Sequence, residues 1–319
     1  MKISVALCTF NGAKYIKEQL NSILDQTLPV DEIIICDDLS TDGTFEILSD
    51  YQKNNPEILR IFQNEKTLKS VKNFEKTISL CTGEVTFLSD QDDYWYPEKV
   101  EIFINKFKED TAMLAFCSNG FLMDENSKIM NDYFTKWDVY EKYSESKPNF
   151  EMFNFITQKG NFSTGATMAI KTEFAKSVFP IPQLQDFHHD EWLTLLATVD
   201  GKMGFIPQKL INYRVHSSQQ VGGIAFHNDS NYFKEILSYF NFNNDTDDFK
   251  SIKSRIKAQV QWHNKFLINF KSNTTQFKFL RNKFLDEYNK NIILMKQKFG
   301  IKYFLVSIID KLTNKRQLK

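Results

Sequence analysis

The chain has 319 residues, of which 42% are hydrophobic and 25% are charged, a composition typical of globular and not of disordered proteins. Its 40 Lys and Arg residues balance 40 Asp and Glu residues, which argues against a nucleic-acid binder covered in basic surface. A membrane-spanning helix needs about 18 consecutive apolar residues, and no apolar run in this sequence is nearly that long. The N-terminus lacks the layout of a signal peptide. We therefore expect a protein that is made and kept inside the cell.

Short β-rich runs alternate with helical patterns over the first 120 residues. Strands are predicted at residues 3–8, 32–36, 58–62, 84–88 and 112–117, and helices at 13–25, from about 42, from about 70 and from Pro97. This alternation predicts an α/β fold, with a mostly parallel sheet covered by helices on both faces. Ligands of such sheets bind beyond the carboxyl ends of the strands.

The remainder of the chain divides into three stretches. Residues 120–160 are polar, aromatic-rich and irregular, and we expect a flexible loop over an active site. A strand at 166–170, a helix at 191–199 and strands near Met203 and Leu210 follow. Beyond a boundary near residue 225 the pattern is helical and rich in Lys. Two apolar stripes at helical spacing lie there, at positions 249, 252, 256 and 260, and at 301, 304, 305, 308, 309 and 312.

The four cysteines lie far apart and form no CxxC pair. Cys8, Cys36 and Cys117 stand in or beside apolar strands, and Cys81 ends a predicted helix. Cysteines in such places are usually small buried hydrophobic side chains, and a reducing cytosol disfavours disulfides. We expect structural cysteines.

Polar side chains gather where the predicted strands end. Thr9 and Asn11 follow the first strand, and Asp37 and Asp38 end the second. Carboxylates at a strand tip suit a ribose hydroxyl or a base N–H, and we favour Asp38 over Asp37 for this contact. The fourth strand ends in residues 89–93, with three carboxylates among five residues. Mutual repulsion there is offset by a divalent cation, since Mg²⁺ or Mn²⁺ takes one or two carboxylates together with substrate phosphates.

These runs resemble the family 2 glycosyltransferases, inverting and metal-dependent enzymes of the GT-A fold that use nucleotide-sugar donors. The resemblance rests on residues 5–11, 34–44, 89–93, 95–97, 189–192 and 213–219, in the expected order. It covers about residues 1–223, and it points to the synthesis of bacterial capsule, lipopolysaccharide or other surface polysaccharide. It implies a GT-A catalytic domain at 1–225, with a nucleotide-sugar half (1–118) and an acceptor half (119–225), followed by a basic helical region (226–319).

The resemblance also implies residue roles. The nucleotide-sugar would be held by residues near the first, second and fourth strands, namely Thr9, Phe10, Asn11, Asp38, Asn73, Asp90 and Gln91. Asp92 would bind Mn²⁺ or Mg²⁺, and His216 would supply a further metal or phosphate contact. Asp190 would be the catalytic base. The alternative for Asp190 is an acid favoured by a helix N-terminus, with Glu191 as the other candidate base.

Two departures from the family pattern concern loops near these residues. Residues 67–69 read Thr-Leu-Lys where many members read Asn-Leu-Gly, which puts the conformation of that loop in question. His189 replaces the more common acidic residue before the base. The neighbouring histidines do not form a recognisable zinc motif, because neither HExxH spacing nor cysteine partners occur. Trp95 and Trp192 are candidates either for sugar stacking or for the core.

One base and one cation suffice for an inverting transfer. A carboxylate accepts the proton of the attacking hydroxyl, and the cation stabilises the leaving nucleoside diphosphate. The expected activity is therefore hexosyl or rhamnosyl transfer to a glycan or lipid-linked acceptor. The alternatives are a sugar nucleotidyltransferase and a non-catalytic nucleotide-sugar or glycan-binding protein that docks on membranes. A processive synthase is disfavoured, since membrane helices and a QxxRW motif are missing.

The neutral total hides a charge asymmetry. Residues 250–319 hold 17 Lys and Arg and three acids, a net charge of +14, so the rest of the chain carries −14. Basic amphipathic helices bind anionic membrane surfaces, which would place the protein peripherally on the inner face of the cytoplasmic membrane. The other interpretations are a helical appendage packed on the catalytic domain and a homodimer contact through the C-terminal helices.

Overall fold

A computed structural model describes residues 1–146, 151–217, 224–227, 247–269 and 275–312. The chain divides into two compact units. The first comprises Met1–Lys142 and Phe162–Asn228, and the second comprises Tyr143–Asn161 and Asp229–Lys319. Each unit is described separately below.

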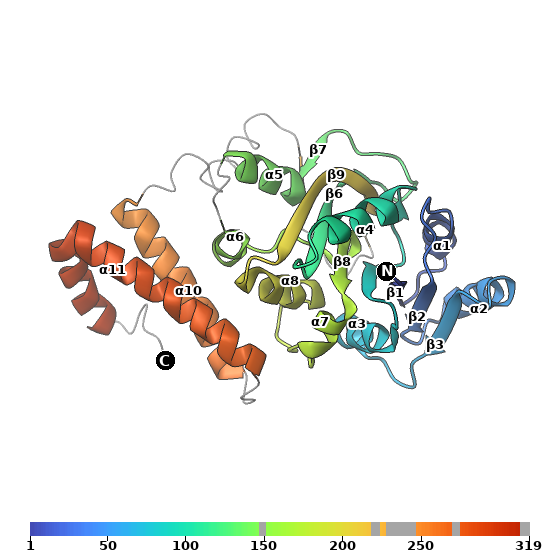
Figure 1. Ribbon diagram of the computed structural model, residues 1–319, viewed down its shortest axis with the longest axis horizontal. Coiled ribbons are helices and arrows are strands. Elements are labelled where there is room, and N and C mark those ends of the chain that lie inside the picture. Colours follow the sequence, from blue (N-terminus) through green and yellow to red (C-terminus); the bar gives the residue numbers. More distant parts are fainter. Residues whose placement is uncertain (147–150, 218–223, 228–246, 270–274, 313–319) are drawn as a thin grey trace. The chain divides into compact units, whose positions relative to one another are not determined.

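The first unit is built on one sheet with the strand order β3-β2-β1-β4-β8-β6-β9-β5 (Figure 1). Its strands are β1 (Ile3–Thr9), β2 (Glu32–Asp37), β3 (Leu59–Gln63), β4 (Val85–Ser89), β5 (Tyr94–Trp95), β6 (Ala115–Met123), β8 (Met168–Lys171) and β9 (Met203–Arg214). Strands β3, β2, β1 and β4 run parallel, as do β6 and β9. Strand β8 is antiparallel to both β4 and β6, and β5 is antiparallel to β9. The expectation of a mostly parallel sheet is confirmed.

Helices cover both faces of this sheet. Every residue of β2 and of β4 is buried, and a strand whose successive side chains point to opposite faces can be buried throughout only when both faces are covered. Helix α3 packs on β1 and β2, α2 packs on β3, and α8 packs on β9. The helices of this unit are α1 (Ile16–Leu24), α2 (Thr44–Asn54), α3 (Lys69–Leu80), α4 (Lys99–Glu109), α7 (Thr172–Ser177) and α8 (His189–Val199), and a 3₁₀ turn, η1, spans Gly165–Thr167.

The expectation of an irregular loop over residues 120–160 is wrong for most of that stretch. Strand β6 continues to Met123, and the short strand β7 (Tyr133–Thr135) pairs with β10 (Ala225–His227). Helices α5 (Lys136–Ser146) and α6 (Met152–Lys159) follow. The aromatic residues here are core residues: Trp137, Tyr143 and Phe153 are buried. Frequent polar residues between them hide the apolar periodicity from a reading of the sequence.

The second unit contains α6, α10 (Phe249–Asn269) and α11 (Thr275–Leu312), together with the last residues of α5. Its aromatic core centres on Trp262, which stacks with Phe266 and Phe284 and donates from Nε1 to the Thr157 carbonyl at 2.9 Å. A second cluster holds Ile252, Ile256 and Met295. The first of the two predicted apolar stripes is therefore a core stripe.

Two findings concern the chain as a whole. The four cysteines are free thiols, and Cys36, Cys81 and Cys117 are buried, as expected. Within the described ranges, no helix is both long enough and apolar enough to cross a membrane.

Candidate active site

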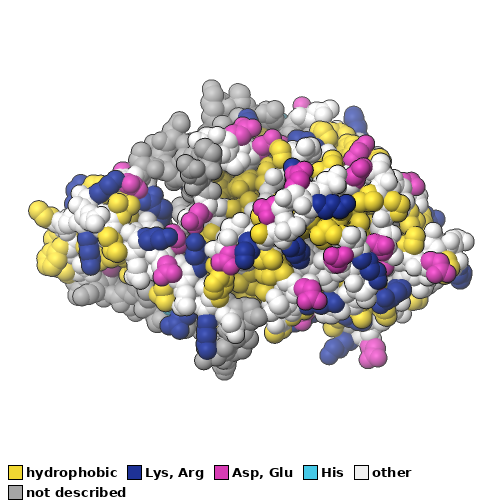
Figure 2. Space-filling model, in the orientation of Figure 1, with side chains coloured by type: hydrophobic (Ala, Val, Ile, Leu, Met, Phe, Trp, Pro, Cys, Tyr) yellow, Lys and Arg dark blue, Asp and Glu magenta, His cyan; other side chains and the backbone are white. Residues whose placement is uncertain are grey.

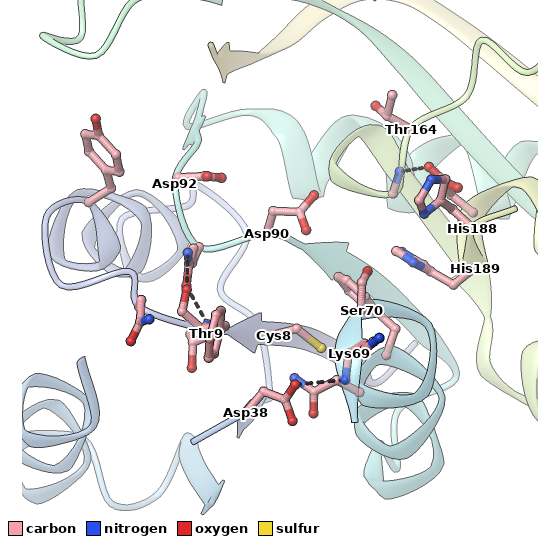
Figure 3. A pocket seen from close by; sticks show the side chains of 18 of the residues that line it. Cys8, Thr9, Asp38, Lys69, Ser70, Asp90, Asp92, Thr164, His188 and His189 are labelled. Atoms are coloured by element: carbon pink, nitrogen blue, oxygen red, sulfur yellow. Dashed lines mark hydrogen bonds between the residues drawn. The ribbon is translucent and has the colours of Figure 1, made fainter. Parts of the chain in front are cut away.

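The ends of three parallel strands and the start of α8 meet at one pocket of about 430 Å³ (Figure 3). Thr9 ends β1, Asp38 follows β2, and Asp90 and Asp92 follow β4. The pocket is lined by all the residues to which the family resemblance gives a role, namely Thr9, Phe10, Asn11, Asp38, Asn73, Asp90, Gln91, Asp92, Asp190 and His216. Asp37 and Glu191 do not line it. The carboxyl edge of the sheet thus gathers residues that are more than 200 positions apart in the chain.

Asp37 and Asp38 have different surroundings. Asp37 is fully buried and accepts hydrogen bonds from Thr9 Oγ1 (2.8 Å) and from the backbone N–H of Ser40 (3.0 Å), so it ties β1 to the loop after β2. Asp38 faces the pocket and accepts from the N–H groups of Leu68 (2.7 Å) and Lys69 (2.9 Å). Asp38 therefore holds the loop that borders the pocket.

The question raised by residues 67–69 is answered by the backbone at Lys69. Lys69 has φ 62°, in the left-handed region that favours glycine. This is the position at which the family pattern has glycine. The N–H of Lys69 donates to Asp38 Oδ2, which holds the strained residue in place. Lys69 thus adopts a backbone conformation that glycine takes up without strain.

The Gln91 side chain forms a frame for the loop after β1. Its Oε1 accepts from the Phe10 N–H at 2.8 Å, and its Nε2 donates to the Phe10 carbonyl at 3.0 Å. A side chain at Gly12 would collide with it, because a Cβ there would lie 2.3 Å from Gln91 Oε1. The Phe10 ring is 41% exposed at the edge of the pocket. An aromatic ring in that position is available for stacking on a ligand.

Carboxyl groups are crowded at Asp90, Asp92 and Asp190, which line the pocket, and at Asp93, which adjoins them in the chain. Burial, and then the nearby carboxylates of Asp92 and Asp190, raises the pKa of Asp90 to about 7. Burial and the same kind of repulsion raise the pKa of Asp93 well above its usual range. Burial lowers the pKa of Lys99 to about 7, and its Nζ donates to the Ala166 carbonyl at 2.7 Å. A pocket that crowds carboxylates in this way favours a cationic ligand.

Asp92 and His216, which both line the pocket, form a pair, with His216 Nε2 2.9 Å from Asp92 Oδ2. No cluster of three or more potential metal ligands occurs in the part of the chain that the structure describes. A carboxylate and an imidazole nevertheless suit a cation that completes its shell with phosphate oxygens and water. The chemistry of this pair, and the raised pKa of Asp90 beside it, fit a divalent ion bound together with a diphosphate.

Arg214 supports that pair, a role that was not predicted from the sequence. The side chain is fully buried; Nε donates to the Asp92 carbonyl at 2.5 Å, and Nη2 donates to Glu18 Oε2 at 2.6 Å. Its backbone N–H donates to Asp93 Oδ1 at 3.0 Å. The only available signal was its place two residues before His216, inside a matched motif. Burial of an arginine is a tertiary property.

Asp190 lies in the first turn of α8, where the helix dipole favours a carboxylate. Its Oδ2 accepts from the Gly165 N–H at 3.0 Å. His189 packs under Gly165: its ring stacks on Phe74 at 3.8 Å, and a Cβ on residue 165 would lie 2.7 Å from His189 Nε2. Both ring nitrogens of His189 are buried without a hydrogen-bond partner, and burial lowers its pKa to about 4. Gly165, also missed from the sequence, is thus fitted between His189 and Asp190.

The two candidate tryptophans belong to the core. Trp95 and Trp192 are 1% and 2% exposed, and Trp192 Nε1 donates to the Val178 carbonyl at 2.9 Å. Neither lines the pocket described above. Of the two interpretations left open by the sequence, core packing is correct for both.

Solved structures share this fold. TarS of S. aureus, crystallised as residues 1–349 with UDP-GlcNAc, aligns over 94% of this chain and 92% of that chain, with a TM-score of 0.53 and 17% identity. The mannosyltransferase PcManGT of Pyrobaculum calidifontis, solved with GDP-Man and Mn²⁺, aligns over 98% of this chain and 80% of that chain, with a TM-score of 0.52 and 16% identity. At these identities the likeness shows the fold alone, which is the expected GT-A arrangement.

Sequence comparison identifies the family. The chondroitin synthase of Escherichia coli is 32% identical over 141 residues, which are 44% of this chain and 20% of that protein. The chain thus spans a small part of this polysaccharide-synthesising relative. Residues 4–179, more than half of the chain, match the family model described as "Glycosyl transferase family 2". The chain therefore belongs to glycosyl transferase family 2.

Proposed function

We propose that the chain transfers a sugar from a nucleotide-diphosphate sugar to a glycan or lipid-linked acceptor, with inversion at the anomeric carbon and with help from Mn²⁺ or Mg²⁺. The observation that carries this proposal is the convergence of Asp38, Asp92 and Asp190 on one pocket. The product would belong to a bacterial surface polysaccharide, the class to which the resemblance in the sequence points. Membership of a glycosyltransferase family speaks against the nucleotidyltransferase alternative.

The donor nucleoside would lie over the ends of β1 and β2. Thr9, Asn11 and Asp38 line that part of the pocket, and the exposed ring of Phe10 offers a stacking surface. The Asp38 carboxylate accepts hydrogen bonds from the Asn64 side chain and from the N–H groups of Leu68 and Lys69. These bonds fix its position before a nucleoside binds. Asn73 fixes the same region, since its Nδ2 donates to the Cys36 carbonyl at 2.9 Å.

The diphosphate would lie near Asp90, Asp92 and His216. Asp92 and His216 would hold the cation, which supplies Lewis-acid stabilisation to the leaving group. The chain's own contribution is to keep this pair in place: Arg214 holds the Asp92 carbonyl, and Gln91 fixes the adjoining loop. Burial and the neighbouring carboxylates raise the pKa of Asp90, and a cation bound beside it would lower that pKa again.

Asp190 would accept the proton of the acceptor hydroxyl. Two backbone donors hold its carboxylate, the Gly165 N–H on Oδ2 and the Glu191 N–H on Oδ1 (2.7 Å). Hydrogen bonds of this kind fix the direction of the remaining lone pairs. Glu191, the other candidate base, does not line the pocket.

Donor binding is tested first, by the thermal shift of the full chain with UDP-GlcNAc, GDP-mannose and dTDP-rhamnose, with and without Mn²⁺. Stabilisation by one donor, and only with the metal, supports the proposal. No response to any nucleotide sugar contradicts it.

Catalysis is then tested with Asp190→Asn, which keeps the shape of the side chain. We expect unchanged donor binding and a fall in transfer rate of about 10²- to 10⁴-fold. Glu191→Gln is the matched control and should transfer at close to the normal rate. Unchanged transfer by Asp190→Asn overturns its role as the base, and donor binding without any transfer by the wild-type chain indicates a non-catalytic binding protein.

A further inference from the structure

The last part of α11 presents an apolar face to solvent. The helix is interrupted at Phe299 (φ −140°, ψ 36°), and the residues after it form a new helical segment. On that segment Ile301 is 83% exposed, Phe304 63%, Leu305 56% and Ile308 41%. Their spacing of three and four residues places them on one side of the helix. This is the second apolar stripe of the sequence, and it is not a core stripe.

The opposite side of the same segment is anchored. Phe299 and Tyr303 pack against the buried cluster of Ile252, Ile256 and Met295. The segment is therefore already packed on the second unit through its other side, and the exposed apolar face is its outer side. Large apolar side chains that gather in this way on a surface usually mark a site of association.

The positive charge of the C-terminal region indicates which kind of partner the exposed apolar face binds. Residues 250–319 carry a net charge of +14, and Lys302 lies on the same helical segment as the apolar stripe. Figure 2 shows hydrophobic side chains gathered over the end of α11, with Lys or Arg side chains beside them. A second copy of this chain would bring an equally basic surface against the first, and like charges repel. A helix with an apolar face and basic neighbours suits the anionic headgroups and acyl chains of a bilayer.

We propose that residues 301–309 dock the protein on an anionic membrane surface. The apolar side chains enter the boundary between headgroups and acyl chains, and the positive charge of residues 250–319 is attracted to the lipid phosphates. The second unit thereby keeps the chain at the surface on which lipid-linked molecules are found. This inference concerns the second unit alone and does not depend on the reaction proposed for the pocket.

The test measures co-sedimentation of the full chain with vesicles of phosphatidylglycerol and phosphatidylcholine in equal parts, and with vesicles of phosphatidylcholine alone. We expect binding to the anionic vesicles that weakens as NaCl is raised from about 0.1 M to about 0.5 M. The double variant Phe304→Ser, Leu305→Ser should bind at least about tenfold more weakly. The matched control is Phe279→Ser, Ile293→Ser, which removes two exposed apolar side chains from the same helix before the interruption.

The control variant should bind within about twofold of the wild type. Circular dichroism establishes that both variants are folded. The proposal is overturned if the wild-type chain ignores anionic vesicles, or if the control loses as much binding as the 304/305 variant. It is also overturned if light scattering shows a dimer that the 304/305 substitutions dissociate while vesicle binding stays unchanged. None of these outcomes requires activity, so failure of the proposed reaction would leave the test intact.

Discussion

His216 Nε2 lies 2.9 Å from Asp92 Oδ2, although 124 positions separate the two residues in the chain. His216 follows β9, and Asp92 lies between β4 and β5. Strand β5 pairs antiparallel with β9, with Tyr94 opposite Asn212, and this pairing brings Asp92 beside His216. Beneath it, Arg214 Nε holds the Asp92 carbonyl. This pair is the centre of the proposed cation site.

Removing the imidazole should weaken metal binding more than it disturbs the fold. For His216→Ala we expect the Mn²⁺ concentration that gives half-maximal transfer to rise about 10- to 100-fold. Direct Mn²⁺ binding, followed by electron paramagnetic resonance with UDP present, should weaken in parallel. His227→Ala, which removes an exposed histidine outside the pocket, is the control. Equal metal affinity in both variants would remove His216 from the site.

A methyl group at residue 165 should collide with His189 and thereby displace the backbone that holds Asp190, the proposed base. In Gly165→Ala the new Cβ meets His189 Nε2 at 2.7 Å, and the displacement draws the 165 N–H away from Asp190. We expect at least about a tenfold loss of kcat, in line with a misplaced catalytic group. Adding His189→Ala makes room for the methyl group and should recover part of that loss. A double variant no better than Gly165→Ala would show that the collision is not the cause.

His189 should make the protein less stable in mild acid. Its pKa is lowered from 6.5 to about 4 by burial, so the unfolded chain takes up a proton below about pH 6.5 that the folded chain refuses until about pH 4. The free energy of unfolding therefore falls as the pH drops through this window, by up to about 1.4 kcal/mol per pH unit from this group. Urea unfolding of wild type and His189→Gln between these pH values measures the difference. Identical pH slopes would contradict the assignment.

Loss of the Arg214 side chain should destabilise the first unit. The buried Arg214 guanidinium pairs with Glu18 at 2.6 Å and donates to the Asp92 carbonyl. The substitution Arg214→Met removes both interactions. Removing one partner of a buried charged network costs about 3–5 kcal/mol, and the partly exposed Glu18 carboxylate places the value toward the lower end. Thermal unfolding measures this change. Arg60→Met, which breaks a half-exposed ion pair with Glu32, should cost far less.

The candidate site was largely predictable because its residues follow strands. Asp38, Asp90 and Asp92 come directly after apolar runs, and parallel strands end at a common edge, so local sequence implies their proximity. Arg214, Gly165 and Lys99 were not predictable in this way. Each acts through a partner distant in the chain, and nothing local distinguishes a buried arginine or lysine from a solvated one.

The two apolar stripes of the C-terminal region show most clearly what the sequence alone does not determine. Both have helical spacing, and the sequence determined that both segments are helices, as it determined the alternation of strands and helices over the first 120 residues. Only the tertiary structure decided that Ile252 and Ile256 are buried while Ile301 and Phe304 face solvent. Periodicity reports that a helix has an apolar face, but burial depends on whether another element of the fold reaches that face.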